Sequence, residues 1–267
     1  MTKQSTQTKI EDLLRLTSLP DFSKVKNNPD IMESVASSLY GVPESEIITV
    51  NFLDTVWSPN TRVYETLFKD GLIKQFYYKK CLESSLSEAV GWTLSNILLG
   101  ENHNFVASRS ETGDWKFGYV AMEDIGTSVT YFNDASTNMS QSFGASLELA
   151  KTLSLTDRNN SNLVICENSI IRNVDYETIF NKEYSWNLGM LKDIFKGGYV
   201  LGLDAELVSQ GQSDARKIIV KNFLDNESLI KDVLTYFSEQ SGLQYLDDEK
   251  HIEDPFSYMK LYLEAEK

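Results

Sequence analysis

The chain has 267 residues, with 39 Asp and Glu against 25 Lys and Arg, so its formal net charge at neutral pH is −14. Binding to nucleic acid requires a basic surface against the phosphates, so this balance argues against a nucleic-acid partner and equally against docking on an anionic membrane. An acidic field attracts cations, so a basic peptide, a cationic small molecule or a metal–nucleotide complex fits the charge.

The composition is typical of a folded globular chain. Hydrophobic residues make up 41% and aromatic residues 11% of it, which disordered chains do not reach. The length fits one large domain or two lobes. No apolar run approaches the roughly 18 residues of a membrane span. Residues 1–9 lack an apolar signal core, so we expect a cytoplasmic protein.

Cysteine and histidine are too few and too scattered for two common kinds of site. Cys81 and Cys166 are the only cysteines, and both stand in strand-like apolar stretches. They are expected to be buried free thiols rather than a disulfide. With only His103 and His251 beside them, the sequence argues against structural zinc and shows no Ser-His-Asp pattern.

The first half of the chain reads as a β-rich region with few helices. Lys69-Asp70-Gly71 stands between two apolar runs, as in a tight hairpin turn, and Gly41 and Gly100 follow helical patterns that they would end. In chain order, the predicted elements are helices over 10–17 and 29–40, strands over 47–54, 62–68 and 72–81, a helix over 86–98, and strands over 105–108 and 115–122.

The second half reads as mostly helical. After a connector at 123–126, the patterns predict a helix over 140–153 and two short strands separated by Glu167-Asn168-Ser169. A further helix is expected after Asn226, which is a good N-cap residue. The remaining predicted elements are the two strands themselves, 163–166 and 170–174, and helices over 186–195 and 215–224.

Three polar residues in the middle of the chain carry a chemical pattern. Asp157 and Asn162 are five residues apart in a polar loop, and Asp175 follows the second short strand. Phosphoryl transfer uses one Asp to position and deprotonate a hydroxyl, and an Asn and a second Asp to hold Mg²⁺. Asp and Asn are also ordinary turn residues. The full series of helix, Asp-x4-Asn, strand, turn, strand and Asp favours phosphotransfer over a plain turn.

Residues 155–180 resemble the kinase-like superfamily, and its atypical branches more than ordinary protein kinases. Leu155-Thr156-Asp157-Arg158-Asn159 is similar to the Asp-Arg-His loop of phosphoinositide-type kinases, with Asn159 in place of His. Residues 174–180, VDYETIF, resemble Ile-Asp-Leu-Glu-Thr-Leu-Phe of the dehydratase domain in class II lanthipeptide synthetases. That domain also has a Thr-Asp-x4-Asn loop. Residues 118–126 are similar to the hinge of aminoglycoside-type kinases. The likeness covers about residues 45–195 in element order.

The resemblance implies an α+β, two-lobed protein-kinase-like fold that binds ATP and Mg²⁺ between its lobes. The N-terminal lobe would comprise residues 1–122 and the helical C-terminal lobe residues 123–267. Asp157 would act as the catalytic base, while Asn162 and Asp175 would hold the metal.

The same resemblance places the adenine base against the connector between the lobes. The backbone of Met122, Glu123 and Asp124 would meet the adenine edge, as the hinge does in kinases of this type.

A lysine and a glutamate must then come from the N-terminal half. Lys79, late in the third predicted strand, stands where such kinases carry the lysine that contacts the α- and β-phosphates. Lys74 and Lys80 are competitors on the other face of the strand, and any of the three could be a solvated strand end.

Glu88, in the first turn of the next helix, is the expected partner of that lysine. Ser85-Leu86-Ser87-Glu88 is also a capping-box pattern. A glutamate that caps its own helix cannot readily reach a lysine, so the two roles exclude each other.

The glycine-rich phosphate loop of protein kinases is missing, since residues 55–61 contain no glycine. Ser58 and Asn60 are candidates for phosphate contacts, and an ordinary turn at Pro59 explains the segment equally well. Because these glycines are missing, a degraded pseudokinase is an alternative interpretation of the chain. Glu177 is either an additional metal acid or a solvated loop residue.

Three functions follow from these patterns. The first is a peptide-modifying kinase that phosphorylates Ser or Thr, in lanthipeptide-type biosynthesis; without a zinc-binding cyclase set, it would be a stand-alone partner. The second is a small-molecule kinase of the aminoglycoside or choline type. The third is a non-catalytic kinase-like binding protein.

The acidic charge is concentrated at the C-terminus. Residues 225–267 hold eleven acids against four lysines, which is half of the net charge. A cationic acceptor would fit this surface, although a solvated helical face is the more ordinary interpretation.

Overall fold

The computed structural model describes residues 3–25, 28–53, 59–128, 136–155, 162–180, 202–240 and 252–265. These residues form a mixed α+β fold of two compact units. The first unit comprises Met1–Thr93, Asn102–Asp124 and Tyr236–Tyr245, and the second comprises Leu94–Glu101, Ile125–Thr235 and Leu246–Lys267. The longest segment of the second unit thus begins directly after Asp124, which lies within the predicted connector.

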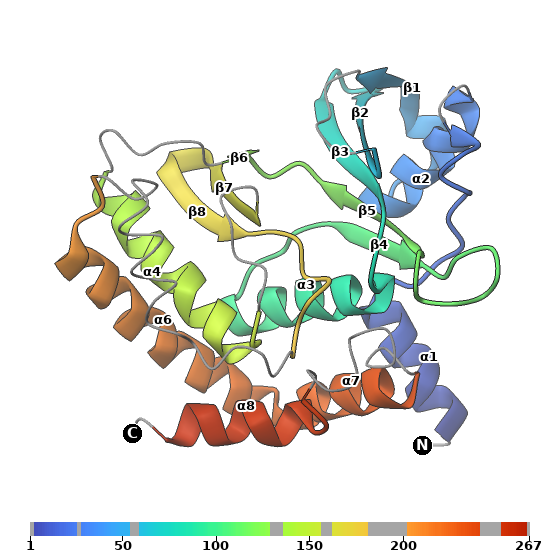
Figure 1. The fold of residues 1–267 in the computed structure, drawn as a ribbon. Helices are drawn as coiled ribbons and strands as arrows, with labels where there is room; N and C mark the ends of the chain where they lie inside the picture. Colours follow the sequence, from blue (N-terminus) through green and yellow to red (C-terminus); the bar gives the residue numbers. More distant parts are fainter. Residues whose placement is uncertain are drawn as a thin grey trace. The chain divides into compact units, whose positions relative to one another are not determined.

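The first unit contains a five-stranded antiparallel sheet in the order β1-β2-β3-β5-β4 (Figure 1). Each strand predicted from alternation in this region is present. The strands are β1 (Ile47–Leu53), β2 (Thr61–Phe68), β3 (Ile73–Lys80), β4 (Phe105–Ser108) and β5 (Tyr119–Glu123). The helical elements are α1 (Lys3–Leu13), α2 (Pro29–Tyr40), the short 3-10 helix η2 (Glu44–Glu46) and the first part of α3 (Ser85–Leu99).

One face of this sheet is covered by α2. The helix begins with Pro29 in its first turn and ends at Gly41, whose φ of 66° is left-handed as a C-terminal glycine requires. Its apolar stripe packs on alternate residues of β3, including Phe76 and Tyr78. By strand alternation, the residues between them are on the opposite face. Lys74 and Lys80 are therefore on the face of Phe76 and Tyr78, and Lys79 is on the other.

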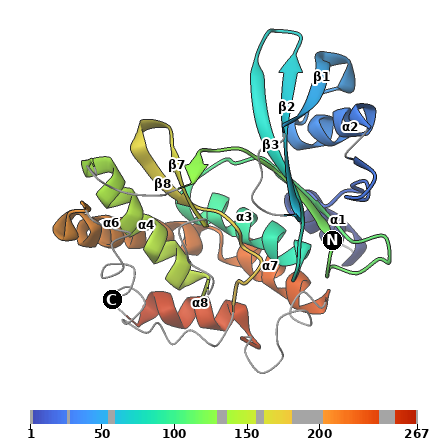
Figure 2. The ribbon, with the colours of Figure 1, turned by 45° about the horizontal axis from the view of Figure 1, so that its top comes forward.

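The second unit is built on helices and a three-stranded sheet of order β6-β7-β8. Its strands are β6 (Thr127–Ser128), β7 (Leu163–Cys166) and β8 (Ile170–Asn173), and η4 (Glu167–Ser169) joins the last two. Its helices are α4 (Thr137–Thr152), α6 (Ala205–Asp225), most of α7 (Glu227–Glu239) and α8 (Pro255–Glu264). Phe143 and Leu147 of α4 pack against Ile171 of β8 and Val208 of α6. Helix α4 therefore contacts both α6 and the small sheet (Figure 2).

Three predicted boundaries were wrong. The strand predicted over 115–122 begins only at Tyr119, because the carbonyls of Trp115 and Gly118 accept hydrogen bonds from Ser85 and Cys81 outside any strand ladder. The first helix covers Lys3–Leu13 rather than 10–17. Helix α6 begins at Ala205 rather than 215, after the cap residue Asp204.

Other expectations have mixed outcomes. Cys81 and Cys166 form no disulfide, as predicted; Cys81 is buried, but Cys166 is only partly buried, so the predicted burial was wrong for Cys166. Asn226 separates α6 from α7, but its side-chain amide donates to the carbonyl of Asn222 at the end of α6. The helix predicted over 186–195 lies outside the described residues. Among the described helices, none combines the length and the apolar character that crossing a membrane requires.

Helices α4 and α6 approach so closely that glycine is required on both. A Cβ atom on Gly144 would overlap with the carbonyl oxygen of Val208, and one on Gly211 would overlap with that of Gln141. Neither backbone can move without separating the helices and opening the apolar cluster between them.

We therefore expect Gly144→Ala to lower the free energy of unfolding by about 1–3 kcal/mol, because overpacking outweighs the gain in helix propensity. Urea denaturation followed by circular dichroism measures the change. Ser209→Ala, at an exposed position of α6, is the control and should stay within about 0.5 kcal/mol. Equal effects of the two substitutions would contradict the close crossing.

Candidate functional site

The β7–β8 hairpin brings two predicted metal ligands to the same end of one small sheet. Asn162 directly precedes β7, and Asp175 follows β8 by one residue. Leu163 pairs with Asn173 across the hairpin, and the N–H of Val174 donates to the carbonyl of Asn162 at 3.1 Å. Asn162 is buried. Residues thirteen apart in sequence therefore become neighbours through antiparallel pairing alone.

Asp175 has an unusual backbone conformation. Its φ is 64°, in the left-handed region, which costs most side chains free energy but which Asp and Asn tolerate. The neighbouring backbone is anchored, since the hydroxyl of buried Tyr176 donates to the carbonyl of Asn173 at 3.2 Å. A little further on, the N–H of Phe180 donates to the carbonyl of Leu153 at 2.8 Å. Such a held conformation, directly after a strand, is common at functional loops.

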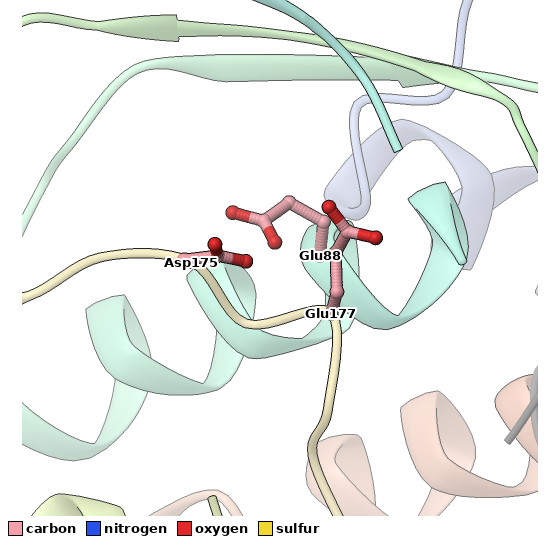
Figure 3. Close-up of side chains that lie close together, drawn as sticks. All are labelled: Glu88, Asp175 and Glu177. Carbon is pink, nitrogen blue, oxygen red and sulfur yellow. The ribbon is translucent and has the colours of Figure 1, made fainter. Parts of the chain in front are cut away.

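Glu177 lies beside Asp175. Its exposed fraction is only 6%, so its interpretation as a solvated loop residue is wrong. A carboxylate oxygen of Glu177 and one of Asp175 lie within 4.8 Å of each other, and Figure 3 shows both side chains on the segment that follows β8. Two carboxylates and the Asn162 amide are hard oxygen donors of the kind that Mg²⁺ prefers, so this residue set fits the predicted cation.

The predicted catalytic base lies outside the described residues. Asp157, with its neighbours Arg158 and Asn159, belongs to the undescribed segment 156–161. The residues that bound this segment, Leu155 and Asn162, are both buried. The role of Asp157 stays a prediction.

In the first unit, Lys79 is on the face of the sheet opposite to α2. It pairs with Thr61 on β2 and Val120 on β5, and it is half-buried. Phe105 of β4 pairs with Met122 of β5, and alternation puts both on the face of Lys79. The ring of Trp92 on α3 stacks on Phe105 with 6.5 Å between centroids. Helix α3 is therefore on the side to which Lys79 points.

The competing lysines are on the α2 face and have other contacts. Lys74 Nζ lies 2.9 Å from a carboxylate oxygen of Glu123 and 5.0 Å from the centre of the Tyr40 ring. Lys80 Nζ lies 5.5 Å from the centre of the Phe117 ring. Of the three lysines, Lys79 alone shares its face with α3, which favours it as the phosphate-contacting residue.

Glu88 is on α3 (Figure 3) and is fully buried. The capping-box interpretation of this residue is wrong. Ser84 caps the helix instead, because its Oγ accepts from the N–H of Ser87 at 3.2 Å, and the N–H of Ser85 already donates to the carbonyl of Trp115. The Glu88 carboxylate accepts from Trp92 Nε1 at 3.0 Å. The carboxylate is therefore shielded from water, and its pairing with Lys79 stays a prediction.

Two of the three predicted hinge residues already use their backbone N–H groups in hydrogen bonds within the first unit. Met122 is buried. The N–H of Glu123 donates to the carbonyl of Asn104, and that of Asp124 to the carbonyl of Gln75, both at 2.9 Å. These two donors are used inside the first unit, so an adenine edge would have to meet other backbone groups of the segment.

The side chain of Glu123 is held by two donors. Lys74 binds one carboxylate oxygen at 2.9 Å, and Asn104 Nδ2 donates to the other at 2.8 Å. Burial opposes ionisation of this carboxyl, but the hydrogen bonds from Lys74 and Asn104 outweigh it and hold the pKa of Glu123 below its ordinary value of 4.5. Because the folded-state pKa is depressed, the ionised form stabilises the fold above pH 4.5, and this contribution is lost as the pH falls through the folded-state value.

Glu123→Gln should therefore lower the free energy of unfolding by about 1–3 kcal/mol at pH 7, where Lys74 loses a charged partner. The difference from wild type should shrink as the pH falls below 4.5. Urea titrations between pH 7 and 3 measure it. Glu111→Gln breaks the exposed pair with Lys24 and should change stability by less than about 0.5 kcal/mol. A difference that stays constant with pH would contradict the assigned role of Glu123.

Of the two phosphate-contact candidates between β1 and β2, the structure describes one. Ser58 falls within 54–58, outside the described residues. The carbonyl of Asn60 accepts from the N–H of Lys80 at 2.8 Å, which fixes the backbone at the start of β2. Contact of either residue with phosphate stays a prediction.

Comparison with known proteins gives fold similarity only. No protein-family model matches the chain, and no curated protein matches it by sequence. The open conformation of CtTel1 is similar in structure, with a TM-score of 0.50 and 10% identity over 98% of this chain. The C2-symmetric CtTel1 dimer gives a TM-score of 0.49 at the same identity. This chain spans only 14% of the CtTel1 chain, and at such identity the likeness concerns the fold alone.

Proposed function

We propose that the chain is an ATP- and Mg²⁺-dependent phosphotransferase whose two units are the lobes of a kinase-like fold. The observation that carries the proposal is the β7–β8 hairpin, which sets Asn162 beside the backbone of Val174 and hence next to Asp175. This is the arrangement that an Asp-x4-Asn loop and a following metal-binding Asp require.

The residues of the second unit would hold the metal and position the acceptor. Asn162 and Asp175 offer the oxygen ligands, and Glu177, buried beside Asp175, offers a third. Bound Mg²⁺ would supply charge neutralisation on the phosphates. Asp157 would orient the acceptor hydroxyl and take up its proton, as the resemblance implies.

The residues of the first unit would hold the nucleotide. Lys79 points to the α3 side of the sheet and would neutralise charge on the α- and β-phosphates. Glu88 would orient Lys79, which is the usual arrangement in kinases. Its complete burial supports this role, because a charged carboxylate away from water needs a cationic or hydrogen-bonding partner.

The acceptor that we propose is the Ser or Thr hydroxyl of a peptide, in lanthipeptide-type modification, because residues 174–180 resemble that dehydratase domain. The acidic C-terminal segment would favour a cationic peptide. Asp247, Asp248 and Glu249 of that segment lie outside the described residues. A small amino-alcohol acceptor would instead indicate a kinase of the aminoglycoside or choline type.

Binding of Mg·ATP is the first test. We expect Mg·ATP to raise the midpoint temperature of unfolding by several degrees at saturating concentration, and Asp175→Asn to remove the Mg²⁺-dependent part of this rise. Asn tolerates the left-handed backbone, so this variant should fold. Glu167→Gln removes an exposed acid from the other end of the hairpin and should leave the rise intact. Equal loss in both variants, or no rise in wild type, would refute the metal site.

Two neighbouring lysines of β3 allow a direct test of the lysine assignment. Lys79→Met should weaken ATP binding about tenfold or more, since a charged contact to phosphate is lost. Lys80→Met, the adjacent residue on the opposite face, should bind ATP as wild type does. The reverse order of effects would assign the phosphate contact to Lys80.

Turnover separates an enzyme from a binding protein. Asp157→Asn should abolish ADP release in the presence of a Ser- and Thr-containing basic peptide while Mg·ATP binding persists, because the base is not a metal ligand. Wild-type protein that binds Mg·ATP without turnover on peptides or amino-alcohols would be a non-catalytic kinase-like protein.

A further inference from the structure

A pocket within the first unit is lined by none of the residues discussed above as part of the nucleotide site. It has a volume of about 370 Å³ and is lined by the chain that follows α1, by the end of β4 and by Tyr236 of α7. The main chain here is well anchored, because Thr17 donates to the carbonyl of Ala107 at 2.9 Å and Leu16 bridges to the same residue.

Two residues that line this pocket carry buried donor atoms without acceptors among the described residues. The exposed fractions of Ser108 and Trp115 are 3% and 4%. Neither Ser108 Oγ nor Trp115 Nε1 has a hydrogen-bond partner among the described residues. An indole N–H can only donate, and leaving a buried donor unsatisfied costs about 1–3 kcal/mol. Folded proteins avoid this cost unless something else supplies the acceptor.

The charged group nearest to these donors is also a donor. Arg109 is exposed, and its guanidinium lies 4.7 Å from the centre of the Trp115 ring. It donates to Gln240 Oε1 at 2.8 Å and to the carbonyl of Gly113 at 3.5 Å. A guanidinium has five N–H groups, so these contacts leave donors available for a ligand.

The acidic residue of the pocket is already engaged. Glu11 accepts from Gln7 Nε2 at 3.0 Å and from the hydroxyl of Tyr236 at 3.1 Å. Both contacts are made by Oε1, and the charge of this carboxylate opposes binding of an anion. The unmet hydrogen-bonding needs of Ser108 and Trp115, by contrast, are for acceptors. Thr17 and Ser18, both exposed, add hydroxyl groups at the rim.

We propose that this pocket binds the oxyanion group of a small molecule, a carboxylate or a phosphate, on Ser108, Trp115 and Arg109. The donors of Ser108 and Trp115 are shielded from bulk water, so side chains that line the pocket would have to move for the oxyanion to reach them, while exposed Arg109 would pair with its charge. An oxyanion offers several lone pairs in one small group, so a single bound group can accept from more than one of these donors. The site is independent of the proposed phosphotransfer.

The test uses acetate and inorganic phosphate as probes on the full chain. Isothermal titration measures their affinities, and the indole ¹H–¹⁵N resonance of Trp115, assigned with Trp115→Phe, reports contact at the site. We expect saturable binding of at least one probe with a shift of this resonance. Ser108→Ala and Trp115→Phe should each weaken binding about tenfold or more. Tighter acetate binding would indicate a carboxylate ligand, and tighter phosphate binding a phosphorylated one.

Matched variants show whether binding belongs to this pocket or to another part of the chain. Ser87 also carries a buried hydroxyl without a partner among the described residues but does not line the pocket, so Ser87→Ala should keep wild-type affinity. Without a probe, Ser108→Ala should be as stable as wild type or more so, since no hydrogen bond is lost. Lys79→Met should also retain binding, which distinguishes this pocket from the proposed nucleotide site.

Three results would overturn the proposal. The first is the absence of saturable binding of either probe, which would leave water as the acceptor. The second is unchanged affinity in both Ser108→Ala and Trp115→Phe. The third is loss of binding in Lys79→Met alone, which would place the oxyanion at the nucleotide site.

Discussion

The register between β7 and β8 is the constraint on which the candidate site depends. Pairing of Leu163 with Asn173 decides that Asn162 and Asp175 emerge at the same end of the hairpin. A shift by one residue would exchange the two faces of β8 and turn Ile171 out of the apolar cluster. Core packing and the placement of Asn162 and Asp175 are therefore set by a single choice of register, and neither can change alone.

Much of this arrangement could be predicted from the sequence, because its signals are local. Alternation and the Lys69-Asp70-Gly71 turn predicted β2 and β3, and Pro29, Asp30 and Gly41 predicted both ends of α2. The strands on either side of Glu167-Asn168-Ser169 were also predicted, and with them the approach of Asn162 to Asp175. Each of these features depends on residues that are close in sequence or that pair within one hairpin.

The remaining features depend on contacts between distant segments. The first part of α6 contains Ser209, Gly211 and Ser213, which are poor helix formers, and packing of Val208 and Gly211 on α4 overrides that preference. The cap of α3 could not be assigned because Ser84 and Ser85 are both good N-cap residues, and the carbonyl that decides between them belongs to Trp115. Burial of Glu177 likewise follows from its surroundings and has no local signal.

The crossing of α4 and α6 also bears on how the second unit folds. Gly144 and Gly211 are far apart in the chain, and the intervening residues include the β7–β8 hairpin. Bringing the two glycines together closes a long loop, whose entropic cost must be met before the contact gives any stability. The helix crossing is therefore expected to form late and cooperatively with the hairpin. Substitutions at the crossing should then reduce the yield of the correctly folded β7–β8 hairpin even though they touch neither Asn162 nor Asp175.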